Sequence, residues 1–330
     1  MIHSSSLTAA AQTTDIIRSD FPGADAVRAE LTAGLLAKNA HTSPKYLYDA
    51  LGSKLFEAIC ELPEYYPTRT EAGIFDEHLA GIVDSIGSGV TLIDLGASNC
   101  AKAAKLFPRL QPAHYVPIDI SIDHLRESVA RLQQQFPEVA MSGVGLDFST
   151  SFELPESVPR ERRVFFYPGS SIGNFMPHEA QAFLRRLRDA CDADGGLLIG
   201  VDLIKEKSIL DAAYDDALGV TAAFNLNLLR HLNHVLDADF DVGEWQHRAF
   251  FDAELGRVEM HLEAQRDLRV VWTGGQRRFQ RGERIHTENS YKYDMEKFLL
   301  FLQQAGFGEA RVWTDARQWF ALIHAQAIPR

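Results

Sequence analysis

The sequence predicts an α/β fold in which a parallel sheet is covered by helices on both faces. Short apolar runs of strand length alternate with helical segments, and these runs cover 90–95, 114–118, 142–146, 163–168 and 196–202. The first run ends in Asp94, a turn follows at Gly96, and a helix is expected to begin shortly afterwards. Buried parallel strands are joined to helices in this way at the edge of a nucleotide-sized pocket. The alternation of strand and helix predicts that the strands run parallel in one sheet.

The remaining elements are predicted from apolar spacing and turn residues. Residues 1–22 are expected to form a flexible arm, and Thr70 is expected to cap a helix that ends near Ile86. Other helices are predicted at 24–38, 55–62, 209–218, 221–236 and 294–305. Further strands are predicted at 246–252, 256–264, 268–273, 309–314 and 319–326. Between them, a turn at Gly274–Gly275 and a polar run over 276–283 lead to the segment 285–290.

The composition argues against several classes of function. The 330 residues have a formal net charge of −12, which disfavours nucleic acid as the main partner because phosphate binding needs clustered Lys and Arg. The cysteines at 60, 100 and 191 lie far apart and predict neither a disulfide framework nor a metal site. No apolar run approaches the roughly 20 residues that span a bilayer, and no signal peptide is recognisable. We expect a cytoplasmic protein that binds neither nucleic acid nor membrane.

The glycine turn after the first strand narrows the class of cofactor. Dinucleotide folds need the pattern Gly-x-Gly-x-x-Gly because the backbone must approach a pyrophosphate. Here Gly96 is the only glycine of that pattern, since Ser98 and Ala101 fill the other places. No Gly-Lys-Ser/Thr follows, which excludes a P-loop. What remains is a ligand with adenosine but no phosphates. S-adenosylmethionine (SAM) fits, with its methionine tail against Gly96.

Residues at three later strand ends agree with this cofactor. Asp119 can accept hydrogen bonds from both ribose hydroxyls and Asp147 from an adenine amino group, while Phe148 offers a ring for stacking. The segment 167–175 follows the fourth strand, where the transferring group is expected. Taken alone, Asp119 could equally well be a helix cap as a ligand of the ribose. Phe148 alone is better explained as a core residue than as a stacking surface. Four such features at successive strand ends point to one site.

Several long motifs resemble the histidine Nα-methyltransferases of ergothioneine biosynthesis. They are SPKYLYD at 43–49, LPEYYPTRTE at 62–71, SIGN at 171–174, YDDA at 214–217, FNLN at 224–227 and TENS at 287–290. The likeness extends from about residue 25 to the C-terminus. It implies transfer of methyl groups from SAM to the α-amino nitrogen of L-histidine, up to three times, which gives the trimethyl betaine hercynine. The implied partner is a small-molecule substrate, L-histidine or its methylated forms. We also expect a monomer, although the sequence leaves the oligomeric state open.

The resemblance also implies a division into two domains. A Rossmann-like class I methyltransferase core is expected from 70–205 and 292–330. A second, smaller α+β domain that binds the substrate is expected from 23–69 and the insertion 206–291.

The resemblance assigns roles to individual residues. The expected catalytic residues hold the amine and carboxylate of the substrate, and they are Asn174, Tyr214 and Tyr65. Glu288 and Ser290 hold the imidazole, and Tyr48 approaches it through water. The expected substrate pocket is completed by Phe56, Gly169 and Met260. The positions at which the family binds SAM are Gly96, Lys102, Asp119, Asp147 and Phe148.

The chain departs from the family pattern at two places. The family has Glu-Leu-Gly-Ser-Gly where this chain has Asp94-Leu95-Gly96-Ala97-Ser98. Serine disfavours a positive φ at the position of the second glycine, so the loop is expected to differ locally. The family has Met-Arg-Thr-Glu where this chain has Ile285-His286-Thr287-Glu288. The pair Glu288 and Ser290 remains, and on an extended segment the two side chains project to the same side.

Alternative interpretations remain open at this stage. Without the resemblance, Glu288 is better explained as a surface acid on a strand. One alternative function keeps the fold and the chemistry but acts on another amino acid, such as a tryptophan derivative. The other alternative is a protein that binds SAM or an amino acid without catalysis. His231 and His234 are three apart on a helix, but no third ligand has suitable spacing, so no metal is expected.

Overall fold

The computed structural model describes residues 15–18, 23–149 and 152–329, and its centre is an eight-stranded sheet. The strands follow the order β1-β4-β3-β2-β5-β6-β13-β12. All neighbours from β1 to β6 run parallel, whereas β13 is antiparallel to both β6 and β12. The strands are β1 (Asp15–Arg18), β2 (Thr91–Leu95), β3 (His114–Asp119), β4 (Ala140–Gly145), β5 (Arg163–Tyr167), β6 (Gly196–Asp202), β12 (Phe307–Thr314) and β13 (Phe320–Ala327). The predicted parallel sheet is therefore confirmed.

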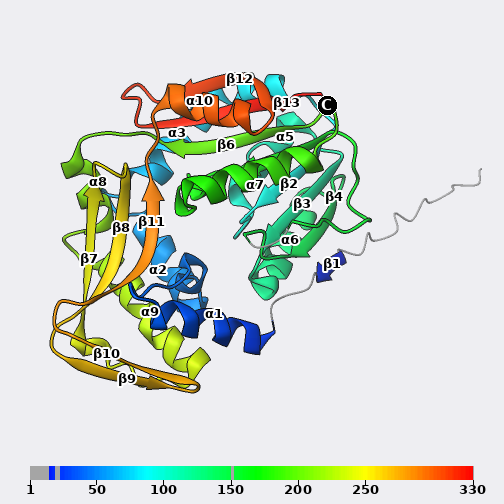
Figure 1. Cartoon of the computed structure of the whole chain (residues 1–330). Helices are drawn as coiled ribbons and strands as arrows, with labels where there is room; N and C mark the ends of the chain where they lie inside the picture. Colours follow the sequence, from blue (N-terminus) through cyan, green and yellow to red (C-terminus); the bar gives the residue numbers. More distant parts are fainter. Residues whose placement is uncertain (1–14, 19–22, 150–151, 330) are drawn as a thin grey trace, which may run out of the picture.

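Helices cover both faces of this sheet. Successive strand residues point to opposite faces and are apolar, so both faces must be buried. Leu92 packs into one buried apolar cluster and its neighbour Ile93 into another. The first cluster takes residues from α3 (Tyr66–Ile86), α4 (Ala101–Ala104), α5 (Phe107–Leu110) and α6 (Ile122–Gln135). The second cluster takes residues from α7 (Pro177–Ala190) and α10 (Met295–Gln304), which lie in front of the sheet in Figure 1. Both faces of the central strands are thus removed from water.

A third apolar cluster lies beside the sheet and combines two distant parts of the sequence. Its buried members fall between Leu31 and Tyr66 and between Leu210 and Ile285. The helices of this part are α1 (Ala24–Leu36), η1 (Pro44–Leu47), α2 (Ala50–Cys60), α8 (Lys207–Tyr214), α9 (Val220–Leu236) and η3 (Val242–Glu244). A three-stranded antiparallel sheet, β11-β8-β7, closes its side at the left of Figure 1. This part and the main sheet have separate cores.

The strands of this second part carry a bulge that matters for the site. They are β7 (Trp245–Asp252), β8 (Arg257–Ala264), β9 (Leu268–Trp272), β10 (Gly275–Phe279) and β11 (Arg284–Tyr291). The pairing of β11 with β8 shifts between His286 and Glu288, and the Thr287 hydroxyl donates to the Met260 carbonyl at 3.0 Å. An extra residue in one strand reverses which residues face inward. As a result Glu288 and Ser290 are shifted to the face of Ile285, and from Thr287 onward both faces of β11 are buried.

Three local expectations differ from the structure. Helix α3 begins four residues before Thr70, whose hydroxyl donates within the helix to the Tyr66 carbonyl at 2.8 Å, so Thr70 is not the cap. Part of the polar run after Gly274–Gly275 is strand β10, paired with β9. In the predicted arm 1–22, residues 15–18 form β1 at the edge of the main sheet, while 1–14 and 19–22 lie outside the described residues. Both strands of the β9–β10 hairpin keep one exposed face, so β10 contains polar residues. These polar residues made the segment look like a loop in the sequence.

Candidate active site

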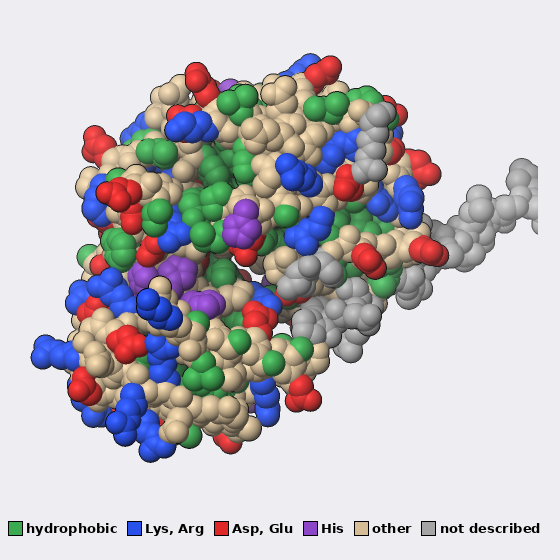
Figure 2. Space-filling model, viewed as in Figure 1, with side chains coloured by type: hydrophobic (Ala, Val, Ile, Leu, Met, Phe, Trp, Pro, Cys, Tyr) green, Lys and Arg blue, Asp and Glu red, His purple; other side chains and the backbone are tan. Residues whose placement is uncertain are grey.

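A deep cavity opens where the main sheet meets the second part of the chain. Its volume is about 2140 Å³, larger than the roughly 300–1,000 Å³ of a pocket for one small ligand. Figure 2 shows the surface hollowed between the two halves, with histidine side chains beside the hollow. Among the predicted site residues, the cavity is lined by Tyr48, Phe56, Gly96, Asp119, Asp147, Phe148 and Asn174. These predicted cofactor and substrate residues therefore share one space, whereas the predicted residues Lys102 and Gly169 do not line it.

The turn after β2 has a left-handed backbone, the conformation that lets a ligand approach the main chain closely. Gly96 has φ 72° and, with Ala97, donates its backbone N–H to the Ile118 carbonyl at 2.9 and 3.0 Å. Ser98 also has a positive φ, 47°. The expectation that serine would keep this position out of the left-handed region is wrong. The Ser98 N–H donates to Asp119 Oδ2 at 2.9 Å, and this bond holds the strained residue in place.

Three residues at the ends of β3 and β4 lie around this turn. Asp119 Oδ1 accepts from the Ser121 N–H at 2.8 Å, so both of its oxygens are oriented by the backbone. Phe148 lies next to the turn, 3.9 Å from the position that a Cβ on Gly96 would take. Asp147 Oδ2 accepts from Lys45 Nζ at 3.1 Å, although the two residues are far apart in the sequence. The strand ends thus converge as predicted, and Lys45 is a contact that the sequence did not reveal.

Lys102 and Gly169, predicted for different ligands, are joined through a buried glutamate. Glu71 Oε2 accepts from Lys102 Nζ at 2.6 Å, and Glu71 Oε1 accepts from the Gly169 N–H at 2.7 Å. Gly169 has φ 76°, and a Cβ there would lie 3.4 Å from Lys102 Nζ. Glu71 is 1% exposed. It ties the turn after β5 to the helix that follows the glycine turn.

Aromatic rings form a box beside the cavity. The ring centroids of Tyr48 and Phe56 are 5.5 Å apart, those of Phe56 and Tyr65 6.1 Å, and those of Tyr65 and Tyr214 6.0 Å. Phe224 of α9 completes the box at 5.5 Å from Tyr48. All of these pairs meet edge to face. Tyr48 and Phe56 line the cavity, while the other rings lie behind them.

The polar end of the box is formed by α8 and β11. The Tyr214 hydroxyl and Ser290 Oγ are 2.7 Å apart, and both are buried. Glu288 is 8% exposed and lies opposite Met260 in the strand pairing. Burial raises the pKa of Glu288 to about 7, although the charge of Lys292 opposes this shift. Among the residues predicted for the substrate, Tyr65, Tyr214, Met260, Glu288 and Ser290 lie close to the box but do not line the large cavity.

Asn174 reaches the site because its neighbour is a glycine. It ends the turn η2 (Ser171–Asn174), which packs against β11. A Cβ on Gly173 would lie 2.8 Å from the Tyr291 carbonyl oxygen, so only glycine permits this approach. The half-buried Asn174 side chain then faces the cavity from the sheet side.

The described residues hold no group of three or more His, Cys, Asp or Glu side chains that could bind a metal ion. The Nδ1 atom of His231 lies 2.8 Å from the Tyr46 carbonyl oxygen, so this histidine serves packing between α9 and η1. Within the same residues, none of the helices has the length and apolar character needed to cross a bilayer.

Comparisons with known proteins agree with this geometry. A family model described as histidine-specific, SAM-dependent methyltransferase matches residues 27–327. A histidine N-alpha-methyltransferase from Mycolicibacterium smegmatis is 37% identical over 305 residues, covering 91% of this chain and 94% of that protein. One from Mycobacterium tuberculosis is 36% identical, with 90% and 94% covered. The ergothioneine biosynthesis protein 1 of Neurospora crassa is 30% identical over 83% of this chain and 32% of that longer protein. The chain therefore belongs to the family of SAM-dependent, histidine-specific methyltransferases.

Proposed function

We propose that this enzyme transfers methyl groups from SAM to the α-amino nitrogen of L-histidine, up to three times, and so forms hercynine as in ergothioneine biosynthesis. The observation that carries the proposal is the buried pair Glu288 and Ser290, which stands two apart on β11 beside the Tyr214 hydroxyl. A buried carboxyl group and a buried hydroxyl on one side of a strand suit the two nitrogens of an imidazole. An indole offers a single N–H and would leave one of these buried groups without a partner.

The cofactor is assigned to the strand ends of the main sheet. We propose that Gly96 and Lys102 lie against its amino-acid part, that Asp119 accepts from the ribose, and that Asp147 and Phe148 hold the adenine. The turn suits a ligand without pyrophosphate, because two of its positive-φ residues, Ser98 and Cys100, carry side chains that would obstruct a phosphate cradle. SAM supplies an electrophilic methyl group on a sulfonium that leaves readily.

The substrate is assigned to the box and its polar end. We propose that Asn174 and Tyr214 hold the amine and carboxylate, with Tyr65 at the same end, and that Tyr48 meets the imidazole through water. Phe56, Gly169 and Met260 shape the remaining wall. The task of these residues is to position the amine in line with the methyl group, since such placement contributes about 7–11 kcal/mol in comparable reactions. A trimethylated product is tolerated because ring faces attract such a cation.

The amine must lose a proton before each transfer, and the tyrosines are poor candidates for the base. Burial raises the pKa of both Tyr48 and Tyr65 well above the usual value. Their hydroxyls are therefore protonated at neutral pH and act as donors. We propose that water in the large cavity accepts the proton.

We propose that the two separate cores correspond to two domains: a methyltransferase core at 70–205 and 292–330, and a substrate domain at 23–69 and 206–291. The apolar clusters support this division, since their buried members separate along these ranges. We further propose a cytoplasmic monomer without nucleic-acid or membrane partners, in keeping with the net charge of −12.

Mass spectrometry tests the proposed reaction. The enzyme, SAM and each single amino acid are incubated separately, and histidine is expected to gain one, two and three methyl groups. Methylation of another amino acid, such as a tryptophan derivative, without methylated histidine would support the alternative substrate. Methylation of none would support a binding protein without catalysis.

Calorimetry on Glu288→Ala tests the assignment of the imidazole. The variant is expected to bind histidine about tenfold or more weakly, the usual worth of a hydrogen bond to a charged group, with SAM affinity changed less than about twofold. Glu263→Ala is the control, because Glu263 lies on the neighbouring strand and pairs with Arg248 and Arg284. Unchanged histidine binding in Glu288→Ala would remove the assignment.

A further inference from the structure

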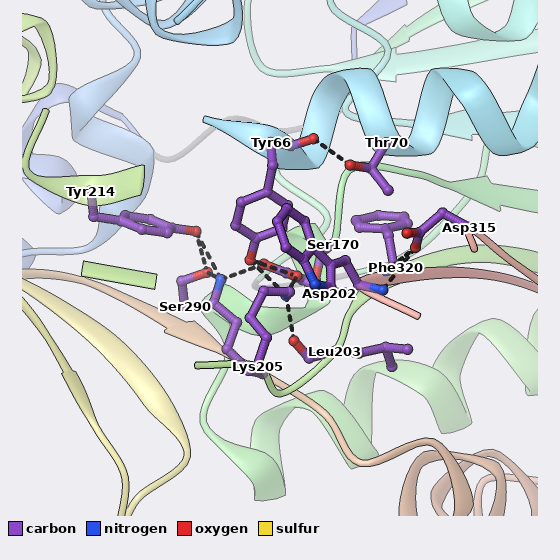
Figure 3. Close-up of polar contacts among 12 residues, drawn as sticks. Tyr66, Thr70, Ser170, Asp202, Leu203, Lys205, Tyr214, Ser290, Asp315 and Phe320 are labelled. Carbon is purple, nitrogen blue, oxygen red and sulfur yellow. Dashed lines mark hydrogen bonds and ion pairs between the residues drawn. The ribbon is translucent and has the colours of Figure 1, made fainter. Parts of the chain in front are cut away.

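A buried lysine behind the substrate pocket connects the polar end of the box to the main sheet. Lys292 directly follows β11, and its side chain is 1% exposed. Its ammonium group donates to Tyr214 Oη at 2.9 Å, Ser290 Oγ at 2.8 Å and Asp202 Oδ2 at 2.8 Å. An ammonium has three hydrogens, so all of them are used. Figure 3 shows Tyr214 and Ser290 on one side of this network and Asp202, at the end of β6, on the other.

The carboxylate of Asp202 is shared by two lysines. Lys205 Nζ lies 2.5 Å from Asp202 Oδ1 and 2.7 Å from the Tyr66 hydroxyl, which itself donates to Asp202. Lys205 therefore shares this acid with Lys292, but its hydrogen bonds go to Asp202, Tyr66 and the Leu203 carbonyl rather than to Tyr214 or Ser290. Either lysine alone balances the charge of Asp202. A second buried lysine is thus not required for neutralisation, and Lys292 needs another explanation.

Lys292 determines where the hydroxyl hydrogens of Tyr214 and Ser290 can point. Lys292 can only donate, so Tyr214 and Ser290 each accept from it. The two hydroxyls are also bonded to each other at 2.7 Å, which uses one of their two hydrogens. One hydrogen is left to point into the pocket. If Ser290 donates to Tyr214, the Tyr214 hydroxyl donates to a carboxylate and Ser290 keeps a lone pair for an N–H of the substrate.

We propose that Lys292 is a positioning residue for the amino-acid substrate. By donating to both hydroxyls it turns their hydrogens away from itself, and in the arrangement where Ser290 donates to Tyr214, the Tyr214 hydroxyl donates to the substrate carboxylate and Ser290 accepts from the imidazole. This inference rests on the proposed function, because it uses histidine as the ligand. It adds a residue that contacts neither substrate nor cofactor but sets the hydrogen-bonding direction of two groups that do.

The test compares Lys292→Met with Lys205→Met. Each variant removes one buried lysine and leaves the other to balance Asp202. Lys292→Met is expected to raise the KM for histidine about tenfold or more, since two charge-assisted hydrogen bonds are lost, with the KM for SAM within about twofold. Lys205→Met is expected to leave both KM values within about threefold of those of the wild type. Equal losses of histidine affinity in both variants would overturn the inference.

A second comparison separates orientation from a general loss of structure. In a Tyr214→Phe background the oriented hydroxyl is absent, so Lys292→Met is expected to change the KM for histidine less than about threefold further. The same factor in both backgrounds would mean that Lys292 is only structural. Lys292→Leu, which likewise has no donor, serves the same comparison if Lys292→Met does not fold. If wild-type enzyme does not methylate histidine, the proposed function fails. If it does and Lys292→Met behaves like the wild type, this inference alone fails.

Discussion

At the scale of single residues, the site contains a carboxyl group that is costly to bury. Glu288 is 8% exposed, and burial raises its pKa from 4.5 to about 7, with Lys292 opposing the shift. The unfolded chain would lose this proton near pH 4.5, whereas the folded enzyme keeps it until about pH 7. Stability therefore falls as the pH rises through this window, by about 3 kcal/mol at roughly 1.4 kcal/mol per unit. The ligand-free enzyme therefore loses stability at neutral pH by burying this carboxyl group, for which we proposed a role in binding the imidazole.

We predict that Glu288→Gln removes this pH dependence. Relative to wild type, the free energy of unfolding of the ligand-free variant is expected to increase by about 3 kcal/mol between pH 4.5 and pH 8. Denaturant titrations of both proteins at these two pH values measure the change. Glu263→Gln is the control: its arginine partners lower the pKa of Glu263 despite its partial burial, so the stability it contributes is lost only as the pH falls. Parallel pH curves for wild type and Glu288→Gln would contradict the prediction.

At the scale of elements, one side chain joins two helices beneath the box. Asp49 caps α2 by accepting from the Gly52 N–H at 2.7 Å, and it also accepts from the Asn227 amide of α9 at 2.7 Å. Tyr48 precedes this cap and Phe56 lies on the helix that it begins. The cap therefore orients two walls of the box through local backbone geometry.

We predict that Asp49→Ala lowers the free energy of unfolding by about 2 kcal/mol, the sum of a typical cap and one further hydrogen bond. Histidine affinity is expected to fall as well, because the walls formed by Tyr48 and Phe56 loosen. Lys54→Ala on the same helix is the control, since its ion pair with Glu57 joins side chains that are 67% and 47% exposed. Thermal unfolding and calorimetry measure both effects, and similar losses in the two variants would refute the role of the cap.

At the scale of the whole molecule, the two parts of the chain meet at the site through polar contacts. Lys45 joins η1 to Asp147, and Tyr66 and Lys292 join the second part to Asp202. None of the described residues forms a cluster suited to a metal ion at this junction or elsewhere. The chemistry proposed above relies on positioning and needs no Lewis acid.

We predict that removal of divalent metal leaves the enzyme active. After dialysis against EDTA, kcat and both KM values for histidine and SAM are expected to stay within about 20% of the untreated values, because the proposed transfer from a sulfonium uses no metal ion. Steady-state assays with and without added Mg²⁺ or Zn²⁺ provide the comparison. A loss of activity that metal restores would contradict the prediction.

The order of strands and helices, and the convergence of Gly96, Asp119, Asp147 and Phe148, were predictable from the sequence. Apolar runs report burial directly, and the carboxyl ends of parallel strands must meet at one edge. The motifs likewise identified the segments around Tyr65, Asn174 and Glu288. Local patterns of this kind depend on neighbours in the chain, so they are visible in one dimension.

Other features depend on contacts between distant residues and became visible only in three dimensions. The left-handed Ser98 is held by Asp119, and the bulge at Thr287 decides which residues of β11 share a face. Lys292 resembles any charged residue after a strand, yet it is buried against Asp202 and Tyr214, 90 and 78 positions away. The burial of a polar side chain and its hydrogen-bond partners are properties of the packed chain, and no local pattern encodes them. The sequence therefore predicted which groups would line the site, and the packing showed which partners hold them.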